Sequence, residues 1–214
     1  DFHSKGYRNT TEKIISKIKK INPDIIVMTG DMVSYDMTGT EEFEKLVKEL
    51  SEIYPIYYID GNHEHLAEKL IPGEYLYFME FLRELGVITI KNDYVEIYKG
   101  NESINLYGVN IPLDWPSGVY VNKLQLERDY VEKTLPEADA DKFNILLAHN
   151  PIFIKQYSKW GANLVLAGHM HGGIVRIPFT NIGLLSPERQ IFPKYAAGKF
   201  KVNGSIMIVN RGIG

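Results

Sequence analysis

The chain has 214 residues, of which 44% are hydrophobic and 24% are charged, a balance typical of a globular protein with one sizeable buried core. Its formal net charge of −3 excludes a basic field that would attract nucleic acid or anionic lipid non-specifically. The absence of cysteine excludes disulfides and thiolate metal sites, so any metal ion must be held by oxygen and imidazole ligands, and no apolar stretch is as long as a transmembrane helix.

The first part of the chain alternates helical patterns with short apolar runs. Isoleucines recur on one stripe of the first expected helix, and Thr10 or Thr11 is available as its N-cap. The alternation of helix and strand predicts a parallel sheet. The expected elements are a helix over residues 9–21, a strand over 25–27, a helix over 41–53 with Phe43, Leu46, Val47 and Leu50 as its inner face, and a strand over 56–59.

From Gly86 onward the pattern changes to short strand-like runs that are separated by turn residues. Turns at such intervals indicate hairpins and an antiparallel or mixed sheet. We therefore expect one α/β domain in which two sheets pack face to face with helices outside them. The expected elements are strands over residues 87–90, 94–98 and 103–109, a helix around 123–135, and strands over 143–148, 164–167 and 206–209.

Short polar clusters stand at the ends of the predicted strands. Strand ends in an open α/β sheet meet in one crevice, so these clusters are expected to deliver their side chains to the same place. In an Asp-x-His or His-x-His pair within an extended segment, the two side chains share a face and can bind one ion or two close neighbours. The clusters are Asp1-Phe2-His3, Gly30-Asp31, Gly61-Asn62-His63-Glu64, Ala148-His149-Asn150 and Gly168-His169-Met170-His171-Gly172.

Each cluster taken alone also has a plainer explanation. An Asp-x-His pair is more often a surface pair than a ligand pair, and Gly-Asp after a strand is usually a turn. Asn62 is a suitable cap for the helix that follows it, and Glu64 suits the first turn of that helix. His149 precedes a turn that contains Pro151. The occurrence of all five clusters in this order makes chance the poorer explanation.

The ordered set D-x-H, G-D, G-N-H-E, H and G-H-x-H-G, which spans Asp1 to His171, resembles the calcineurin-like metallophosphoesterase family. The run from Gly168 to Lys199, with the ending NRGIG, is similar to a branch of small bacterial phosphodiesterases. Some members of that branch are membrane-associated, and some cleave the pyrophosphate of UDP-diacylglucosamine. The resemblance implies an α/β fold, a four-layer α-β-β-α sandwich of two mixed sheets flanked by helices, as a single domain over residues 1–214. The family places a hydrophobic strand before the position of Asp1, and that first strand is missing from this sequence.

The resemblance also implies a site with two divalent metal ions. Asp31 is expected to bridge them, because an anion between two dications screens their repulsion. Oxygen and nitrogen ligands without thiolate favour Mn, with Fe, Zn, Co or Ni as alternatives, over Mg or Ca. The ions would clamp the phosphate and generate a hydroxide at neutral pH. The implied ligands are Asp1, His3, Asp31 and His171 for the first ion, and Asp31, Asn62, His149 and His169 for the second.

By the same resemblance, His63 is a catalytic residue that assists the leaving group and does not bind metal. In many family members an Asp three residues beyond the Gly-Asp aspartate orients this histidine, but Ser34 occupies that position in this chain. Asp36 and Asp60 are the alternative partners for the ring. The neighbouring His65 is expected to be structural or to lie at the rim of the cleft.

Substrate contacts are expected from Asn62 and Arg176, with Arg211 as a further candidate. For each of the two arginines, an ordinary solvated or ion-paired position on the surface is an equal alternative. The loop over residues 111–118 is expected to act as a lid, because it is too apolar to be well solvated. The apolar, irregular segment over residues 179–192 is expected to form a lipid-facing rim.

The predicted function is hydrolysis of phosphodiester, pyrophosphate or phosphomonoester bonds by metal-activated hydroxide. The alternatives are a non-catalytic scaffold of the same fold that binds a protein partner, and a nuclease, which would need positive stripes that the sequence lacks. The expected partner is a small phosphoester substrate, nucleotide- or lipid-linked, with no nucleic acid and no obligate protein partner. The sequence leaves a cytoplasmic and a membrane-associated location open, in a bacterial-like protein.

Overall fold

The computed structural model describes residues 1–3, 8–111, 126–173, 175–176, 183–187 and 191–213. The chain divides into two compact units. The first unit comprises Asp1–Thr89 and Ile213–Gly214, and the second comprises Ile90–Gly212. The expectation that residues 1–214 form a single domain stays a prediction.

The first unit contains a three-stranded sheet in the order β1-β2-β3, in which both strand pairs are parallel. This confirms the parallel sheet that the alternation of helix and strand predicts. Its elements are α1 (Arg8–Ile21), β1 (Ile26–Met28), α2 (Glu41–Ser51), β2 (Ile56–Tyr58), α3 (Asn62–Leu70), α4 (Pro72–Glu84) and β3 (Ile88–Thr89).

Two local expectations for this unit are wrong. The helix α1 begins at Arg8, so Thr10 and Thr11 lie inside its first turn and neither of them is the N-cap. The strand β3 pairs in parallel with β2, so the expected strand over residues 87–90 does not form a hairpin with the next one, over 94–98, although turn residues separate them. A turn residue signals a change of direction, but it does not determine which strand the next one pairs with.

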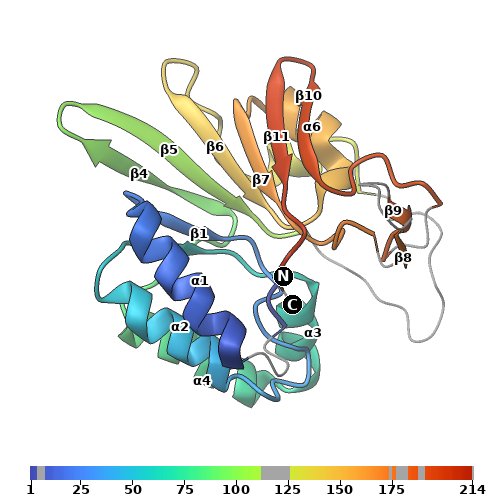
Figure 1. Ribbon diagram of the computed structural model, residues 1–214. Helices are drawn as coiled ribbons and strands as arrows, with labels where there is room; N and C mark the ends of the chain where they lie inside the picture. The colour runs from blue at the N-terminus through green and yellow to red at the C-terminus, as the bar shows by residue number, and fades with distance from the viewer. Residues whose placement is uncertain (4–7, 112–125, 174, 177–182, 188–190, 214) are drawn as a thin grey trace. The chain divides into compact units, whose positions relative to one another are not determined.

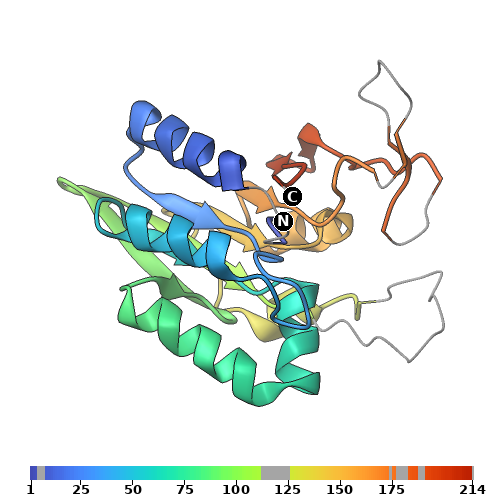
Figure 2. The same cartoon turned by 60° about the horizontal axis from the view of Figure 1, so that its bottom comes forward.

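The helices of the first unit form a layer whose apolar faces make its core. Helix α1 lies beside α2, and α2 lies beside α4 (Figures 1 and 2). The ring centroids of Phe43 and Phe78 are 5.7 Å apart, and those of Phe78 and Tyr58 are 6.1 Å apart, which joins α2 and α4 to the sheet. The predicted inner face of α2 is confirmed by the exposed fractions of its residues, Phe43 0%, Leu46 3%, Val47 0% and Leu50 0%.

This packing predicts the effect of truncating the inner face of α2. Leu50→Ala is expected to lower the free energy of unfolding by about 2–5 kcal/mol, because it removes buried methyl groups and leaves a cavity. Ile53→Ala is the control, since Ile53 lies just after α2 with 52% of its surface exposed, and its effect should stay within about 0.5 kcal/mol. Urea unfolding of both variants measures the difference, and equal losses would contradict the assignment of the buried face.

The second unit contains a six-stranded mixed sheet in the order β10-β11-β7-β6-β5-β4 and a separate pair, β8-β9. The strands β5, β6, β7 and β11 are parallel to one another, while β4 and β10 are antiparallel edge strands. Its elements are β4 (Asp93–Lys99), β5 (Glu102–Val109), α5 (Tyr130–Thr134), β6 (Phe143–Ala148), η1 (Pro151–Phe153), α6 (Ile154–Trp160), β7 (Leu164–Ala167), β8 (Val175–Arg176), β9 (Gly183–Leu185), β10 (Gly198–Val202) and β11 (Ser205–Val209).

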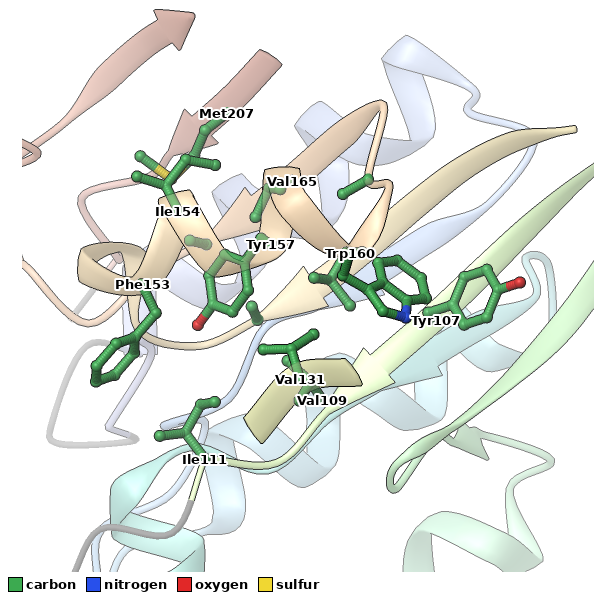
Figure 3. Packing of buried hydrophobic residues seen from close by; sticks show 14 of the residues in the cluster. Tyr107, Val109, Ile111, Val131, Phe153, Ile154, Tyr157, Trp160, Val165 and Met207 are labelled. Carbon is green, nitrogen blue, oxygen red and sulfur yellow. The ribbon is translucent and has the colours of Figure 1, made fainter. Parts of the chain in front are cut away.

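The core of the second unit lies between its large sheet and the helices α5 and α6 (Figure 3). The buried rings of Tyr157 and Trp160 fill this space from α6, and the Trp160 ring meets that of Tyr107 edge-on at 4.7 Å. The polar groups of both side chains, the Tyr157 hydroxyl and the Trp160 ring N–H, are hydrogen-bonded, as is usual for buried aromatic residues. Tyr157 Oη donates to the carbonyl oxygen of Asn150 over 2.8 Å, and Trp160 Nε1 donates to that of Pro136 over 3.1 Å. The first of these bonds anchors the segment that follows β6.

Candidate functional site

Two of the predicted clusters follow adjacent parallel strands of the first unit. Met28 at the end of β1 is paired in register with Tyr58 at the end of β2, and the N–H of Ile59 donates to the carbonyl oxygen of Met28 over 3.1 Å. The Gly30-Asp31 and Gly61-Asn62-His63 segments therefore leave the same edge of the sheet, where ligands bind in α/β folds.

Gly30 and Gly61 allow these two segments to approach closely. A Cβ atom added to Gly30 would lie 2.4 Å from the backbone nitrogen of Gly61, and one added to Gly61 would lie 2.3 Å from Asp31 Oδ1. Gly30 also has a φ angle of +89°, a conformation that side-chain-bearing residues rarely adopt. The glycine before Asp31 is therefore required by the contact between the segments and not only by a turn.

The Asp1–His3 segment lies beside the Gly30-Asp31 segment. The N–H groups of Phe2 and His3 both donate to the carbonyl oxygen of Asp31, over 2.8 Å and 3.3 Å. Asp1 is 6% exposed and Asp31 is 1% exposed, and His3 Nε2 lies 4.0 Å from Asp31 Oδ2. The first unit thus brings the first three predicted clusters together.

The donor atoms of these clusters in the first unit converge. The ligand atoms of His3, Asp31 and His63 lie within 4.8 Å of one another, and the rings of His3 and His63 meet edge-on at 4.5 Å. Asp31 Oδ1 also accepts a hydrogen bond from the backbone N–H of His63 over 2.8 Å, and Asn62 is buried. Carboxylate oxygen and imidazole nitrogen are a donor set that fits divalent transition metals.

His63 is oriented by the main chain. The backbone N–H of Tyr35 donates to His63 Nδ1 over 3.1 Å, so the neutral ring carries its proton on Nε2. The alternative partners have other bonds, because Asp60 Oδ2 accepts from the Tyr75 hydroxyl over 2.8 Å and Asp36 Oδ1 accepts from Thr38 Oγ1 over 2.9 Å. Sequence reasoning missed Tyr35, since a main-chain donor leaves no signal in the residue type.

The fourth and fifth clusters follow neighbouring parallel strands of the second unit. Leu147 of β6 pairs with Leu166 of β7, and just beyond these strands the N–H of Gly168 donates to the carbonyl oxygen of His149 over 3.0 Å. His149 and His169 are each 5% exposed, and His149 Nε2 lies 3.2 Å from His169 Nδ1. Two nitrogens at metal–nitrogen distances of about 2.0–2.1 Å in a tetrahedral site are about 3.3 Å apart, so this spacing fits two imidazole ligands of one ion.

The Gly168–Gly173 segment is a turn and not an extended strand, which corrects the expected geometry of the His-x-His pair. His169 and His171 have φ angles of +65° and +51°, and Gly173 N–H donates to the carbonyl oxygen of Met170 over 2.7 Å. His3 of the Asp-x-His pair likewise has a φ angle of +51°. Met170 between the two histidines is 1% exposed and packs into the second core, which anchors the turn.

Arg211 lies beside this turn. A Cβ atom added to Gly172 would lie 3.1 Å from Arg211 Cγ, so the stem of the arginine packs over the glycine. The segment before it is tied to the end of β7, because Asn210 donates to the carbonyl oxygen of Ala167 through both its N–H, over 2.9 Å, and its Nδ2, over 3.0 Å. Arg176 belongs to β8, but its side chain lies outside the described residues.

Two further expectations fall on residues that the structure describes only in part or not at all. The proposed lid over residues 111–118 lies outside the described residues except for Ile111. The proposed apolar rim over residues 179–192 is described only at 183–187 and 191–192. Both stay predictions.

Comparison with known proteins finds a family match that coincides with the motifs. The family model described as calcineurin-like phosphoesterase matches residues 1–173 of the chain. This range contains every predicted metal ligand from Asp1 to His171.

Two curated relatives extend over most of the chain. It is 28% identical over 211 residues to an uncharacterized metallophosphoesterase of Aquifex aeolicus (strain VF5), with 95% of this chain and 71% of the relative covered. It is 26% identical over 194 residues to the phosphodiesterase YaeI of Escherichia coli (strain K12), with 90% of this chain and 64% of the relative covered. The chain therefore corresponds to a part of each relative.

A solved structure has the same fold at low sequence identity. The phosphopantetheinyl hydrolase PptH from Mycobacterium tuberculosis superposes with a TM-score of 0.59 at 14% identity, over 98% of this chain and 86% of that one. Likeness at this level of identity speaks for the fold alone. The predicted α/β fold with two sheets and flanking helices is thereby confirmed.

Proposed function

Since the chain belongs to the calcineurin-like phosphoesterase family, as the match over residues 1–173 establishes, we propose that it is a dinuclear metal-dependent hydrolase. The proposed substrates are phosphodiesters and pyrophosphates, with phosphomonoesters as a further class. The observation that carries the proposal is the convergence of two proposed ligands, His3 and Asp31, with the proposed catalytic residue His63 at the end of a parallel sheet. One ligand atom from each of the three side chains lies within 4.8 Å of the other two.

The proposed ligand set follows the polar clusters that the sequence predicts. The residues present fit the ions, because each unit gathers carboxylate or imidazole donors at its strand ends and none of them is a thiolate. We assign Mn to the site, with Fe, Zn, Co or Ni as alternatives. The proposed ligands are Asp1, His3, Asp31 and His171 for one ion, and Asp31, Asn62, His149 and His169 for the other.

When bound, the two ions would supply Lewis-acid activation of the phosphate and of the attacking water. Asp31 supplies the negative charge that lowers the repulsion between neighbouring dications. Neutral imidazoles complete the ligand set without adding charge. His63 presents its Nε2–H to the leaving-group oxygen, because the Tyr35 N–H occupies Nδ1. Asn62, Arg176 and Arg211 are proposed to contact the substrate phosphate.

The preference for diesters is supported by the E. coli relative, which is named a phosphodiesterase. A nucleotide- or lipid-linked substrate and a membrane-associated location stay predictions. Among the described helices, none combines the length and the apolar character that crossing a membrane requires.

Metal removal and restoration test the proposed function. Full-length protein stripped with a chelator is expected to lose its activity and to regain it with Mn²⁺, because the site residues cannot activate water without the ions. The assay compares bis-p-nitrophenyl phosphate with p-nitrophenyl phosphate, and a higher rate with the first substrate is expected for a diesterase.

Folded protein that shows no turnover with Mn, Fe, Zn, Co or Ni would contradict the hydrolase and favour the scaffold. Metal-dependent cleavage of a DNA strand faster than of either small ester would favour a nuclease.

A further inference from the structure

The Glu64 carboxylate is fully buried and accepts four backbone hydrogen bonds. A role in capping helix α3 explains only one of them. The exposed fraction of Glu64 is 0%. Glu64 Oε2 accepts from the backbone N–H of Gly61 over 2.8 Å, which is the contact expected of an acidic residue in the first turn of α3. The same carboxylate accepts three more N–H groups from the segment that follows β1, from Asp31 over 2.9 Å, Met32 over 2.8 Å and Val33 over 3.3 Å.

These bonds explain how a carboxylate is accommodated at this position. A buried charge is destabilising unless hydrogen bonds replace its lost hydration, and bonds from N–H groups to a carboxylate are among the stronger ones in proteins. The Tyr58 hydroxyl lies near the same carboxylate. Burial, and after it the nearby charge of Glu64, raises the pKa of Tyr58 well above its ordinary value. Tyr58 therefore stays protonated beside the carboxylate.

The two segments are tied in both directions. Glu64, from the segment after β2, binds the backbone N–H of Asp31, while Asp31 Oδ1 binds the backbone N–H of His63 over 2.8 Å. Asp31 has a φ angle of +53°, a conformation that a side-chain-bearing residue keeps only when surrounding contacts hold it. The three bonds from the Asp31–Val33 segment to Glu64 supply such contacts.

We propose that Glu64 is a positioning residue that holds the Asp31 loop, and with it the Asp31 carboxylate, in the arrangement that binds the metal ions. Glu64 itself does not bind metal, because its oxygens are occupied by backbone N–H groups. This inference rests on the proposed function and adds a residue to it.

The variant Glu64→Gln tests the inference. Glutamine has the same shape, but it offers one acceptor oxygen and an NH₂ group that faces backbone donors, so part of the four bonds is lost. The dissociation constant for Mn²⁺, measured by calorimetry on the full-length metal-free protein, is expected to rise about 10–100-fold, as for other residues that orient metal ligands. Glu68→Gln is the control, since it makes the same change one turn later at an exposed position of α3 and should leave the constant unchanged.

Two further measurements separate positioning from a general loss of structure. Glu64→Asp keeps the charge but shortens the side chain by one methylene, so its Mn²⁺ affinity should lie between those of wild type and Glu64→Gln. In metal-free wild-type protein, the amide hydrogens of Asp31, Met32 and Val33 should exchange slowly, because Glu64 accepts their hydrogen bonds. In any Glu64 variant that folds by circular dichroism they should exchange faster while those of α2 do not, and in Glu68→Gln they should stay as slow as in wild type.

The outcomes distinguish this inference from the proposed function. If wild type binds Mn²⁺ and Glu64→Gln binds it equally well, Glu64 is only a helix cap and the inference is overturned. If Glu64→Gln does not fold, unprotected amides at residues 31–33 in metal-free wild type overturn it instead. Wild-type protein that binds none of the candidate metals contradicts the proposed function itself.

Discussion

Replacement of His63 by Asn is expected to lower turnover by about 10²-fold or more while both proposed metal ions stay bound. The Asn amide oxygen can still accept the hydrogen bond that the Tyr35 N–H donates to His63 Nδ1 over 3.1 Å, so the loop should keep its conformation. What the variant loses is the Nε2–H that is proposed to serve the leaving-group oxygen. Turnover and metal content per chain, measured on the same sample, check the two halves of this prediction.

The leaving group provides a sharper readout of the same variant. If His63 assists the departing oxygen, the loss should be larger for diphenyl phosphate than for bis-p-nitrophenyl phosphate, because the more basic phenolate needs more assistance. His65→Asn is the matched control on the same helix, two residues further along, and it should leave turnover near that of wild type. Near-normal turnover of the His63 variant, or an equal loss with both esters, would contradict the assigned role.

The regular elements near the site could be predicted from the sequence because their buried faces require a regular pattern of apolar residues. The strands predicted over residues 143–148 and 164–167 coincide with β6 and β7, whose runs are apolar and end at a histidine or at Gly-His. The inner face of α2 follows in the same way, since its buried positions are spaced at three and four residues.

Elements without such a pattern of apolar residues were not predicted. The strand β10 contains Lys199 and Lys201 and is mostly exposed at the edge of the sheet, so its pattern resembles that of a polar loop. The helix α6 has only seven residues, Ile154–Trp160, which is too short for a convincing helical period. Both lie in the second unit, where short elements are common.

The site was predictable in its residue types but not in its backbone. Chemistry requires Asp and His at particular places, so the motifs are visible, whereas the positive φ angles of His3, Asp31 and His171 have no counterpart in residue type. The same holds for the Tyr35 N–H and for the bonds from residues 31–33 to Glu64, which use main-chain donors. Positioning by the backbone can be found only in a structure.

Asp31→Asn is expected to abolish activity together with metal binding. The amide oxygen can still accept the bond from the His63 N–H over 2.8 Å, so the fold should survive, but the negative charge between the two proposed ions is lost. Affinity should fall by more than the ~10–100-fold that the loss of a residue orienting a ligand costs, because Asp31 is proposed to bind both ions directly. Metal content measured by mass spectrometry should drop from two ions per chain to one or none.

Asp60→Asn is the matched control for this variant. Asp60 is also a buried carboxylate at the end of a strand in the first unit, at 5% exposure against 1% for Asp31, and its Oδ2 accepts from the Tyr75 hydroxyl over 2.8 Å. An amide oxygen can accept that bond equally well, so Asp60→Asn should keep its metal. If Asp31→Asn retained two ions, Asp31 would not be the bridge. If both variants lost them, the effect would come from the buried charge in general and not from ligation.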